Sequence, residues 1–178
     1  MTKVLAIDTS TSRTSVAIIE ANTVVFNGFL DGATAHGPSL PALVQEALTV
    51  SDVDEVVVGM GPGPFTGLRV GIAFAQSFSL AREIPVRGVC SLDAIAAQIN
   101  EKDFIITVDA RRKEVYWARY TDGVRVGEPA VNFPADVSGV PIHADLFPDM
   151  QALINLPGNI TEPIYLRRPD AVATADRP

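Results

Sequence analysis

One layout occurs twice along this chain and constrains its fold more than any other feature: an apolar strand ending in aspartate, a polar turn, and a second strand. The first copy runs from Val4–Asp8 to Ser15–Ile19, and the second runs from Phe104–Asp109 to Val115–Tyr120. Short apolar runs bounded by turn-forming residues are typical of strands joined as hairpins. The repeat therefore predicts two units, the second of which begins at Phe104.

The first unit predicts the order β-β-β-α-β-α-β-α. Thr23–Phe26 continues an antiparallel meander, and apolar residues at helical spacing predict an amphipathic helix over Pro38–Val50. Val56–Val58 is β-branched and uninterrupted, which is typical of a parallel strand covered on both faces. A second helix, Leu68–Ala81, is apolar almost all round, so we expect it to be buried or covered by a partner. Ser91–Ile99 predicts a third helix.

These patterns divide the chain into a first lobe, residues 1–101, and a smaller, loop-rich second lobe, residues 102–178. Seven prolines between residues 129 and 169 interrupt regular elements in the second lobe. A short helix is expected there between Ala144 and Ile154. Strands that alternate with helices place the chain in the α/β class.

The charge balance argues against direct binding of nucleic acid by this chain alone. The 178 residues hold 14 Lys and Arg against 21 Asp and Glu, a net charge of -7 that repels a phosphate backbone. The single cysteine, Cys90, excludes an internal disulfide, and its apolar surroundings predict a buried, inert thiol. With no leader-like or membrane-length apolar stretch, we expect a cytoplasmic protein without membrane contact.

The polar turn after the first strand is the candidate nucleotide site. Small hydroxyl residues and backbone amides in a tight hairpin can meet phosphate oxygens, and a carboxylate can hold a hydrated magnesium ion. The same residues can instead close the hairpin through Asx and Ser/Thr turns, and the sequence leaves both interpretations open. The candidates, with the equivalent aspartate of the second unit, are Asp8, Thr9, Ser10, Thr11 and Asp109.

The turn after Asp109 differs because it carries Arg111, Arg112 and Lys113. These long basic side chains would fill the space that a nucleotide needs, although they could also clamp a phosphate.

The glycine-rich stretch after the fourth strand does not match a known phosphate loop. Gly61–Gly67 has no lysine after its last glycine, as a P-loop requires, and it lacks the dinucleotide fingerprint. Pro62 and Pro64 also remove two amide donors. We interpret the stretch as a stiff turn in which Gly67 lets another backbone approach, with Phe65 and Arg69 at its rim. Such a surface suits a protein partner better than a small ligand.

Metal and nucleophile sites have little support. His36 is followed four residues later by Leu40 rather than by a second histidine, and His143 is remote in sequence. At the start of a helix, His36 predicts an exposed or capping side chain. A nucleophile elbow is absent, so no catalytic residue and no metal ligand is expected.

Several motifs together resemble those of the TsaB (YeaZ) family, in order from the first strand to near the end of the chain. The Gly61–Arg69 block is the most specific of them. The matching segments are Ile7–Thr11, Ser15–Ala17, His36, Gly61–Arg69, Ser91–Leu92, Asp109–Tyr116 and Tyr165–Arg168.

The resemblance implies a two-lobed, actin-like fold (ASKHA, ribonuclease-H-like) with a reduced second lobe. It implies a non-catalytic role in forming N6-threonylcarbamoyladenosine beside the anticodon of tRNAs that read codons starting with A. In that family a TsaD-type transferase holds the metal and transfers the threonylcarbamoyl group, and a TsaE-type ATPase joins the pair. This chain is then expected to need no cofactor of its own and to meet tRNA only through the complex. Members also form homodimers.

Pairing in the family uses helices of the first lobe. The interface that this implies consists of Gly63, Phe65, Thr66, Leu68, Arg69, Ile72, Phe74 and Phe78. Two departures from the family pattern are Pro64, where relatives usually carry serine, and the short second lobe. The short lobe weakens the case for a nucleotide site between the lobes.

An ATPase or phosphotransferase is the alternative function, because the actin-like fold usually does such work. It would hold magnesium-bound nucleotide between Asp8 and Asp109. The basic turn and the proline-rich loop both count against it. A peptidase is a third interpretation, which the missing metal ligands disfavour.

Overall fold

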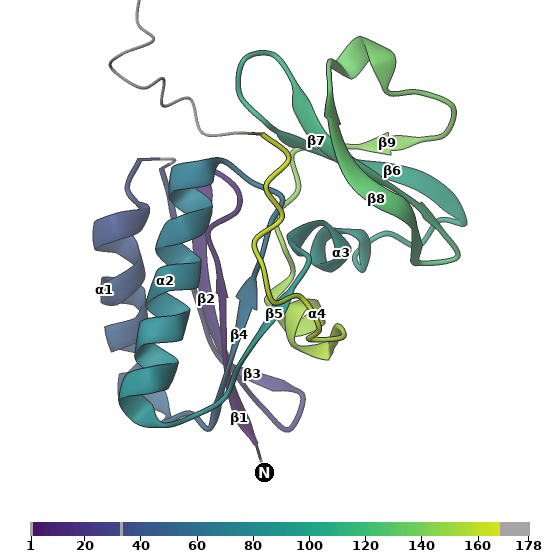
Figure 1. The fold of residues 1–178 in the computed structure, drawn as a ribbon. Helices are drawn as coiled ribbons and strands as arrows, with labels where there is room; N and C mark the ends of the chain where they lie inside the picture. Colours follow the sequence, from purple (N-terminus) through teal and green to yellow (C-terminus); the bar gives the residue numbers. More distant parts are fainter. Residues whose placement is uncertain (1, 33, 168–178) are drawn as a thin grey trace, which may run out of the picture.

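The computed structural model describes residues 2–32 and 34–167, which form two β-sheets with helices around them (Figure 1). The first sheet has five strands in the order β3-β2-β1-β4-β5. β1 pairs antiparallel with β2 and parallel with β4, so a hairpin meander adjoins a parallel half. The strands are β1 Lys3–Asp8, β2 Arg13–Glu20, β3 Thr23–Asp31, β4 Glu55–Gly59 and β5 Val86–Val89.

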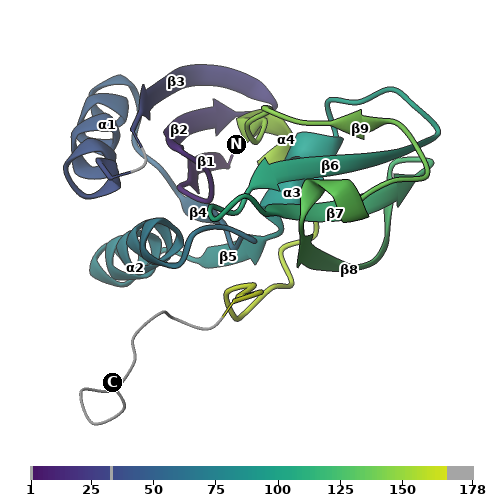
Figure 2. The same cartoon turned by 90° about the horizontal axis from the view of Figure 1, so that it is seen from above.

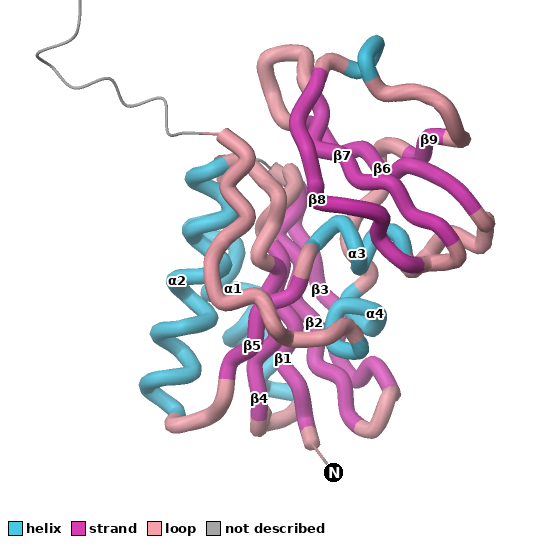
Figure 3. Tube along the Cα trace, turned by 45° about the vertical axis from the view of Figure 1, so that its right-hand side comes forward, coloured by secondary structure: helices cyan, strands magenta, loops and turns pink. Residues whose placement is uncertain are grey.

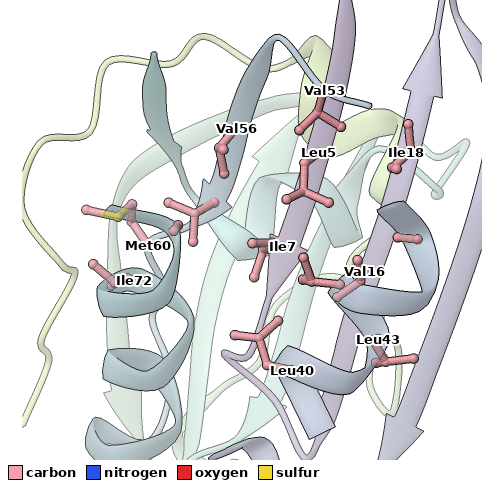
Figure 4. Close-up of a cluster of buried hydrophobic side chains, with 14 of the residues drawn as sticks. Leu5, Ile7, Val16, Ile18, Leu40, Leu43, Val53, Val56, Met60 and Ile72 are labelled. Atoms are coloured by element: carbon pink, nitrogen blue, oxygen red, sulfur yellow. The ribbon is translucent and has the colours of Figure 1, made fainter. Parts of the chain in front are cut away.

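Two long helices, α1 (His36–Val50) and α2 (Phe65–Arg82), cover one face of this sheet (Figures 1 and 2). Successive side chains of a strand point to opposite faces. Leu5 and Ile7 therefore lie in the cluster with the α1 and α2 side chains, while Val4 packs on the other face. Figure 4 shows the α1–α2 cluster around Leu5 and Ile7.

The second sheet has four strands in the order β8-β7-β6-β9. Its strands are β6 Asp103–Asp109, β7 Val115–Thr121, β8 Val124–Asn132 and β9 Ile142–His143, and a 3-10 turn spans Pro134–Asp136. The short helix α3 (Ser91–Ala96) packs on this sheet through Leu92 and Ile95. The hairpin β6–β7 repeats the hairpin β1–β2, with an aspartate closing the first strand of each, so the repeat seen in the sequence is confirmed.

The chain returns to the first lobe after the second sheet. Helix α4 (Met150–Asn155) inserts Met150 and Leu153 against the face of the first sheet opposite α1 and α2. The division of the sequence at residue 102 assigns this helix to the second lobe. It packs instead on the first lobe, because Met150 and Leu153 are buried against the apolar side chains on that face of the first sheet.

The segment that follows α4 runs beside β5 toward the glycine-rich loop (Figure 3). Ile160 donates from its backbone N–H to the Gly88 carbonyl at 3.2 Å, and Ile164 donates to the Met60 carbonyl at 2.8 Å. Arg168, the last residue of the Tyr165–Arg168 motif, lies outside the described residues. Within residues 2–32 and 34–167, no helix has both the length and the apolar character needed to cross a membrane.

Candidate partner-binding site

Asp8 closes β1 and is buried, with both carboxylate oxygens engaged by neighbouring groups. Its Oδ1 accepts hydrogen bonds from the Ser10 backbone N–H at 2.8 Å and the Ser10 hydroxyl at 2.7 Å. Its Oδ2 accepts one from the Ser91 hydroxyl at 2.6 Å. Burial raises the pKa of Asp8, and these hydrogen bonds offset only part of that rise. The carboxylate therefore ties the first hairpin to the start of α3.

Thr9 fastens the same hairpin to α2. Its hydroxyl donates to the Gly67 carbonyl at 2.8 Å and accepts from the Gly71 N–H at 3.1 Å. An added Cβ at Gly67 would lie 3.1 Å from the Thr9 carbonyl oxygen, so the predicted close backbone approach at this glycine is confirmed. The glycines at one-turn spacing let the helix press directly on the hairpin.

The glycine-rich loop, which directly precedes α2, packs on the hairpin. A Cβ at Gly63 would lie 2.4 Å from the Ser10 carbonyl oxygen, so only a hydrogen atom fits there. Thr11 in turn accepts a hydrogen bond from the Arg13 N–H at 3.2 Å. The Asp8 and Thr9 side chains thus connect the hairpin to α3 and α2, whereas the Ser10 and Thr11 side chains form hydrogen bonds within the hairpin. The hydrogen bond from the Ser10 N–H to Asp8 Oδ1 forms an Asx turn, one of the two interpretations that the sequence left open.

Asp109 has a different environment from Asp8. Its side chain is 66% exposed, and it accepts a hydrogen bond from the Arg111 N–H at 2.8 Å. It lines a cavity of about 250 Å³ between the lobes, together with Thr11, Pro64 and Arg111. The structure therefore does not bring the two aspartates into one equivalent pair: one is sealed inside the first lobe and the other lies on the wall of an open cavity.

His36 is buried at the first residue of α1, which corrects the expectation of an exposed or capping side chain. Its Nδ1 lies 2.8 Å from the Thr14 hydroxyl. A Cβ added at Gly67 would lie 3.0 Å from the His36 ring. Burial lowers the pKa of His36, so the ring is neutral near pH 7.

The residues implied for the partner interface separate into two groups. Gly63, Leu68 and Ile72 are buried within the chain itself, so a partner cannot reach them. The other five are exposed or partly exposed along α2: Phe65, Thr66, Arg69, Phe74 and Phe78.

Besides Thr66, the structure adds outward residues of α2 that the sequence analysis did not single out. We define the α2 outer face as six exposed or partly exposed residues on the side of α2 opposite the buried Leu68, none of which carries a charge. Leu80 is the largest of them and is 81% exposed. The six residues are Thr66, Val70, Ala73, Ser77, Leu80 and Ala81.

Charged side chains are scarce on the whole helical layer. The 15 residues of α1 and 18 residues of α2 include three charged residues, Glu46, Arg69 and Arg82, whereas charged residues make up 20% of the chain. A helix on a solvated surface normally carries charged and polar residues on its outer side. An outward face of this composition is typical of a surface that another protein covers.

Two lobes that each begin with a strand–aspartate–turn–strand hairpin, with α1 and α2 covering the first sheet, define the actin-like class of folds. The structure of the ethanolamine utilization protein EutJ from Carboxydothermus hydrogenoformans shares this fold with a TM-score of 0.51 at 10% identity. Its alignment covers 72% of this chain and 50% of EutJ.

Closer similarities identify the family. The family model of TsaD, the tRNA N6-adenosine threonylcarbamoyltransferase, matches residues 33–168. YeaZ from Pseudomonas aeruginosa superimposes with a TM-score of 0.73 at 27% identity, covering 86% of this chain and 89% of YeaZ. A second P. aeruginosa structure, described as similar to peptidase YeaZ, gives a TM-score of 0.78 at 25% identity over 94% of this chain and 100% of its own. The chain belongs to the TsaB (YeaZ) family.

Sequence relatives agree with the structural ones. An uncharacterized protein of Mycobacterium tuberculosis is 45% identical over 197 residues, covering 94% of this chain and 93% of the relative. The tRNA threonylcarbamoyladenosine biosynthesis protein TsaB of Escherichia coli is 38% identical over 127 residues. That match covers 66% of this chain and 54% of the E. coli protein, so the similarity to this relative spans about half of its length.

Proposed function

We propose that this chain is the non-catalytic partner of a TsaD-type transferase. In this role it supports formation of N6-threonylcarbamoyladenosine beside the anticodon of tRNAs that read codons starting with A. The single observation that carries the proposal is the weakly charged α1–α2 layer, which presents an uncharged α2 outer face on an otherwise acidic chain. The names of the TsaB relatives and the match to the TsaD family model supply the pathway.

The hairpin contacts support an accessory role. A phosphotransferase of this fold would need the amides and hydroxyls of the Asp8–Thr11 hairpin for nucleotide phosphates. Here the side chains of Asp8 and Thr9 already form hydrogen bonds with Ser10, Ser91 and α2. We therefore propose that the ATP and the metal ion of the reaction are held by the partner proteins, a TsaD-type transferase and a TsaE-type ATPase. We also propose that the complex works in the cytoplasm.

The same α2 outer face can join two copies of this chain. Its small residues, Ala73 and Ser77 among them, permit close approach of a second helix. In our proposal the homodimer and the complex with the transferase use the same surface, so the two assemblies compete.

The proposal is tested by placing a charge at the centre of the α2 outer face. Ala73→Glu puts a carboxylate on an exposed position, so the folded monomer accommodates it. Burying that charge without a counter-ion costs about 3 kcal/mol or more, which weakens the complex about a hundredfold or more. Titration calorimetry of the variant against the cognate TsaD-type protein measures the change.

Val124→Glu is the matched control, because Val124 is an exposed apolar residue, 68% exposed, on β8 of the second lobe. It adds the same charge, and we expect its affinity for the transferase to equal that of the unaltered chain. If Ala73→Glu binds the transferase as tightly as Val124→Glu and the unaltered chain do, the interface does not lie on the α2 outer face.

A further inference from the structure

The strand β3 (Thr23–Asp31) lies at the end of the first sheet, and in the part of the chain that the structure describes no strand pairs with its outer side. Figure 2 shows it beyond β2 and beside α1. It is nine residues long, whereas a strand usually has about five or six. A strand in this position presents N–H and C=O groups that pair readily with the backbone of another strand.

The backbone groups that point outward follow from a hydrogen bond just beyond the end of β3. The Gly32 N–H donates to the Ser12 carbonyl at 2.9 Å, in the same register as the β2–β3 pairing. In an antiparallel pair, alternate residues direct their N–H and C=O groups toward the neighbouring strand. The even-numbered residues near this end therefore face β2, and the odd-numbered residues between 27 and 31 direct their groups away from the sheet.

β3 lacks the features that usually protect the edge of a sheet, which include lysine, other charged residues, proline and marked irregularity. Residues 23–30 contain no charged residue and no proline. The pairing with β2 is regular from Phe26 to Asp31, and its register shift falls at Val25. Large apolar side chains are instead between 37% and 51% exposed along the strand: Val24, Val25, Phe29 and Leu30.

The strands at the other ends of the two sheets are protected. The backbone of Ile160 bridges β5 at Gly88. β9 is only two residues long. β8 carries Arg125, Glu128 and Pro129, and its pairing with β7 is irregular. The open edge of β3 is therefore an exception among the strand edges of this molecule.

The sequence of β3 is self-complementary about Gly28, which lies near the middle of its regular part. We consider two β3 strands paired antiparallel about a two-fold axis at this residue. Phe26 of one copy then lies opposite Leu30 of the other, and Asn27 lies opposite Phe29. Residues that lie directly opposite each other share a face of the sheet, so each of these pairs covers a large apolar side chain.

The charges near β3 also permit this pairing. The Arg13 guanidinium donates to both carboxylate oxygens of Asp31, at 2.8 and 3.2 Å, and neutralises the acidic end of the strand. In the antiparallel arrangement, Asp31 of one copy lies opposite Val25 of the other, so carboxylates do not face each other across the strands. Two copies of a chain with a net charge of -7 repel each other overall, which favours contact through an uncharged segment.

We propose that β3 pairs antiparallel with β3 of a second copy of this chain, which joins the two first sheets into one continuous sheet. A two-fold axis makes such an interface self-complementary. α2 packs over β1 and β4, away from this edge, so the α2 outer face of both copies stays open (Figure 2). The pairing can therefore form together with a complex through α2. The inference goes beyond the proposed function and does not depend on it.

The experiment starts from Ala73→Glu, which blocks association through the α2 outer face. Leu30→Lys is added to it to place a charge on β3, at a side chain that is already partly exposed. Val124→Lys, added to Ala73→Glu instead, places the same charge on the edge strand β8 and serves as the matched control. Sedimentation equilibrium over a range of concentrations measures the mass, and circular dichroism checks that each variant is folded.

We expect Ala73→Glu, alone or with Val124→Lys, to approach twice the chain mass of 18.9 kDa as the concentration rises. A lysine on an edge strand opposes pairing, so Leu30→Lys should raise the dissociation constant about tenfold or more. Ala73→Glu that remains a monomer over the whole range overturns the inference. Association of the Leu30→Lys variant as tight as that of the control also overturns it.

Hydrogen exchange of the Ala73→Glu variant covers the case in which Leu30→Lys does not fold. The outward N–H groups between residues 27 and 31 should exchange more slowly at concentrations where the mass doubles, while exchange in β8 stays the same. Unchanged exchange in β3 overturns the inference. Slower exchange that appears only after a TsaD-type transferase is added also overturns it, because β3 would then bind that partner rather than a second copy.

Discussion

Gly63 is the position at which the packing of the glycine-rich loop on the first hairpin can be tested most sharply. In Gly63→Ala the new Cβ would lie 2.4 Å from the Ser10 carbonyl oxygen, 2.8 Å from its Cα and 3.0 Å from its carbonyl carbon. All three atoms belong to the backbone, so no side-chain rotation relieves the overlap. The loop or the hairpin must move.

Overpacking of this kind costs about 1–3 kcal/mol. For a chain of this size a loss of 1 kcal/mol lowers the midpoint of thermal unfolding by about 2–4 °C, so we expect a decrease of about 2–12 °C. Urea unfolding followed by circular dichroism measures the free energy directly. The expected change is a lower midpoint concentration with an unchanged slope.

Gly37→Ala is the control, because no atom lies within 4 Å of a Cβ at this position in the first turn of α1. Alanine is favoured over glycine in a helix by up to about 1 kcal/mol, so this variant should match or exceed the stability of the unaltered chain. If Gly63→Ala unfolds at the same urea concentration as the unaltered chain, the loop does not seal the hairpin as described.

Three further predictions concern two buried polar groups and one partly buried arginine. Burial raises the pKa of Asp8 above its value of about 3.9 in the unfolded chain, so the folded chain binds this proton more tightly. The protonated carboxyl therefore stabilises the fold fully below about pH 3.9, and this stabilisation is lost as the pH rises through the raised pKa of the folded chain. Urea unfolding between pH 4 and 8 should therefore show Asp8→Asn gaining stability relative to the unaltered chain as pH rises; a constant difference would contradict a raised pKa. Burial raises the pKa of the Cys90 thiol to about 12, so a thiol reagent at pH 8 should label it only after unfolding, and rapid labelling of the native chain would be inconsistent with this. Arg87 donates to the Leu156 carbonyl at 2.9 Å and forms an ion pair with Glu55. Arg87→Ala should therefore lower the free energy of unfolding by about 1–3 kcal/mol and speed proteolysis of the segment after α4. An unchanged cleavage rate would show that other contacts hold this segment.

Elements with strong local patterns could be predicted from the sequence. The i, i+3, i+4 apolar spacing indicated a helix over Pro38–Val50, and α1 spans His36–Val50. The apolar stretch Leu68–Ala81 lies within α2, which spans Phe65–Arg82. Cys90 was expected to be buried, and it is 2% exposed. In each case the residues that decide the outcome are neighbours in sequence.

Long-range packing could not be predicted in the same way. His36 follows a loop and precedes Gly-Pro, which locally indicates an exposed side chain. Its burial depends on Gly67 and Thr14, which reach it only in the folded chain. The return of α4 to the first sheet is similar, because two apolar side chains in a six-residue helix do not reveal which sheet they cover.

The residues proposed for the partner surface differ in how far the structure leaves them exposed. The sequence indicated the helix after the glycine-rich loop as a partner surface, yet Leu68 and Ile72 point into the core. Apolar character alone cannot separate the two faces of a helix that is apolar all round. Burial in the folded structure makes that separation and directs attention to Ala73 and Leu80.

An omission assay tests the central claim most directly. Unmodified tRNA is incubated with the cognate TsaD-type and TsaE-type proteins, ATP and a source of threonylcarbamoyl-adenylate, with and without this chain, and the modified nucleoside is quantified after digestion. A required accessory subunit predicts loss of product when the chain is omitted and recovery when it is added back. Equal product in both reactions would contradict the proposed function.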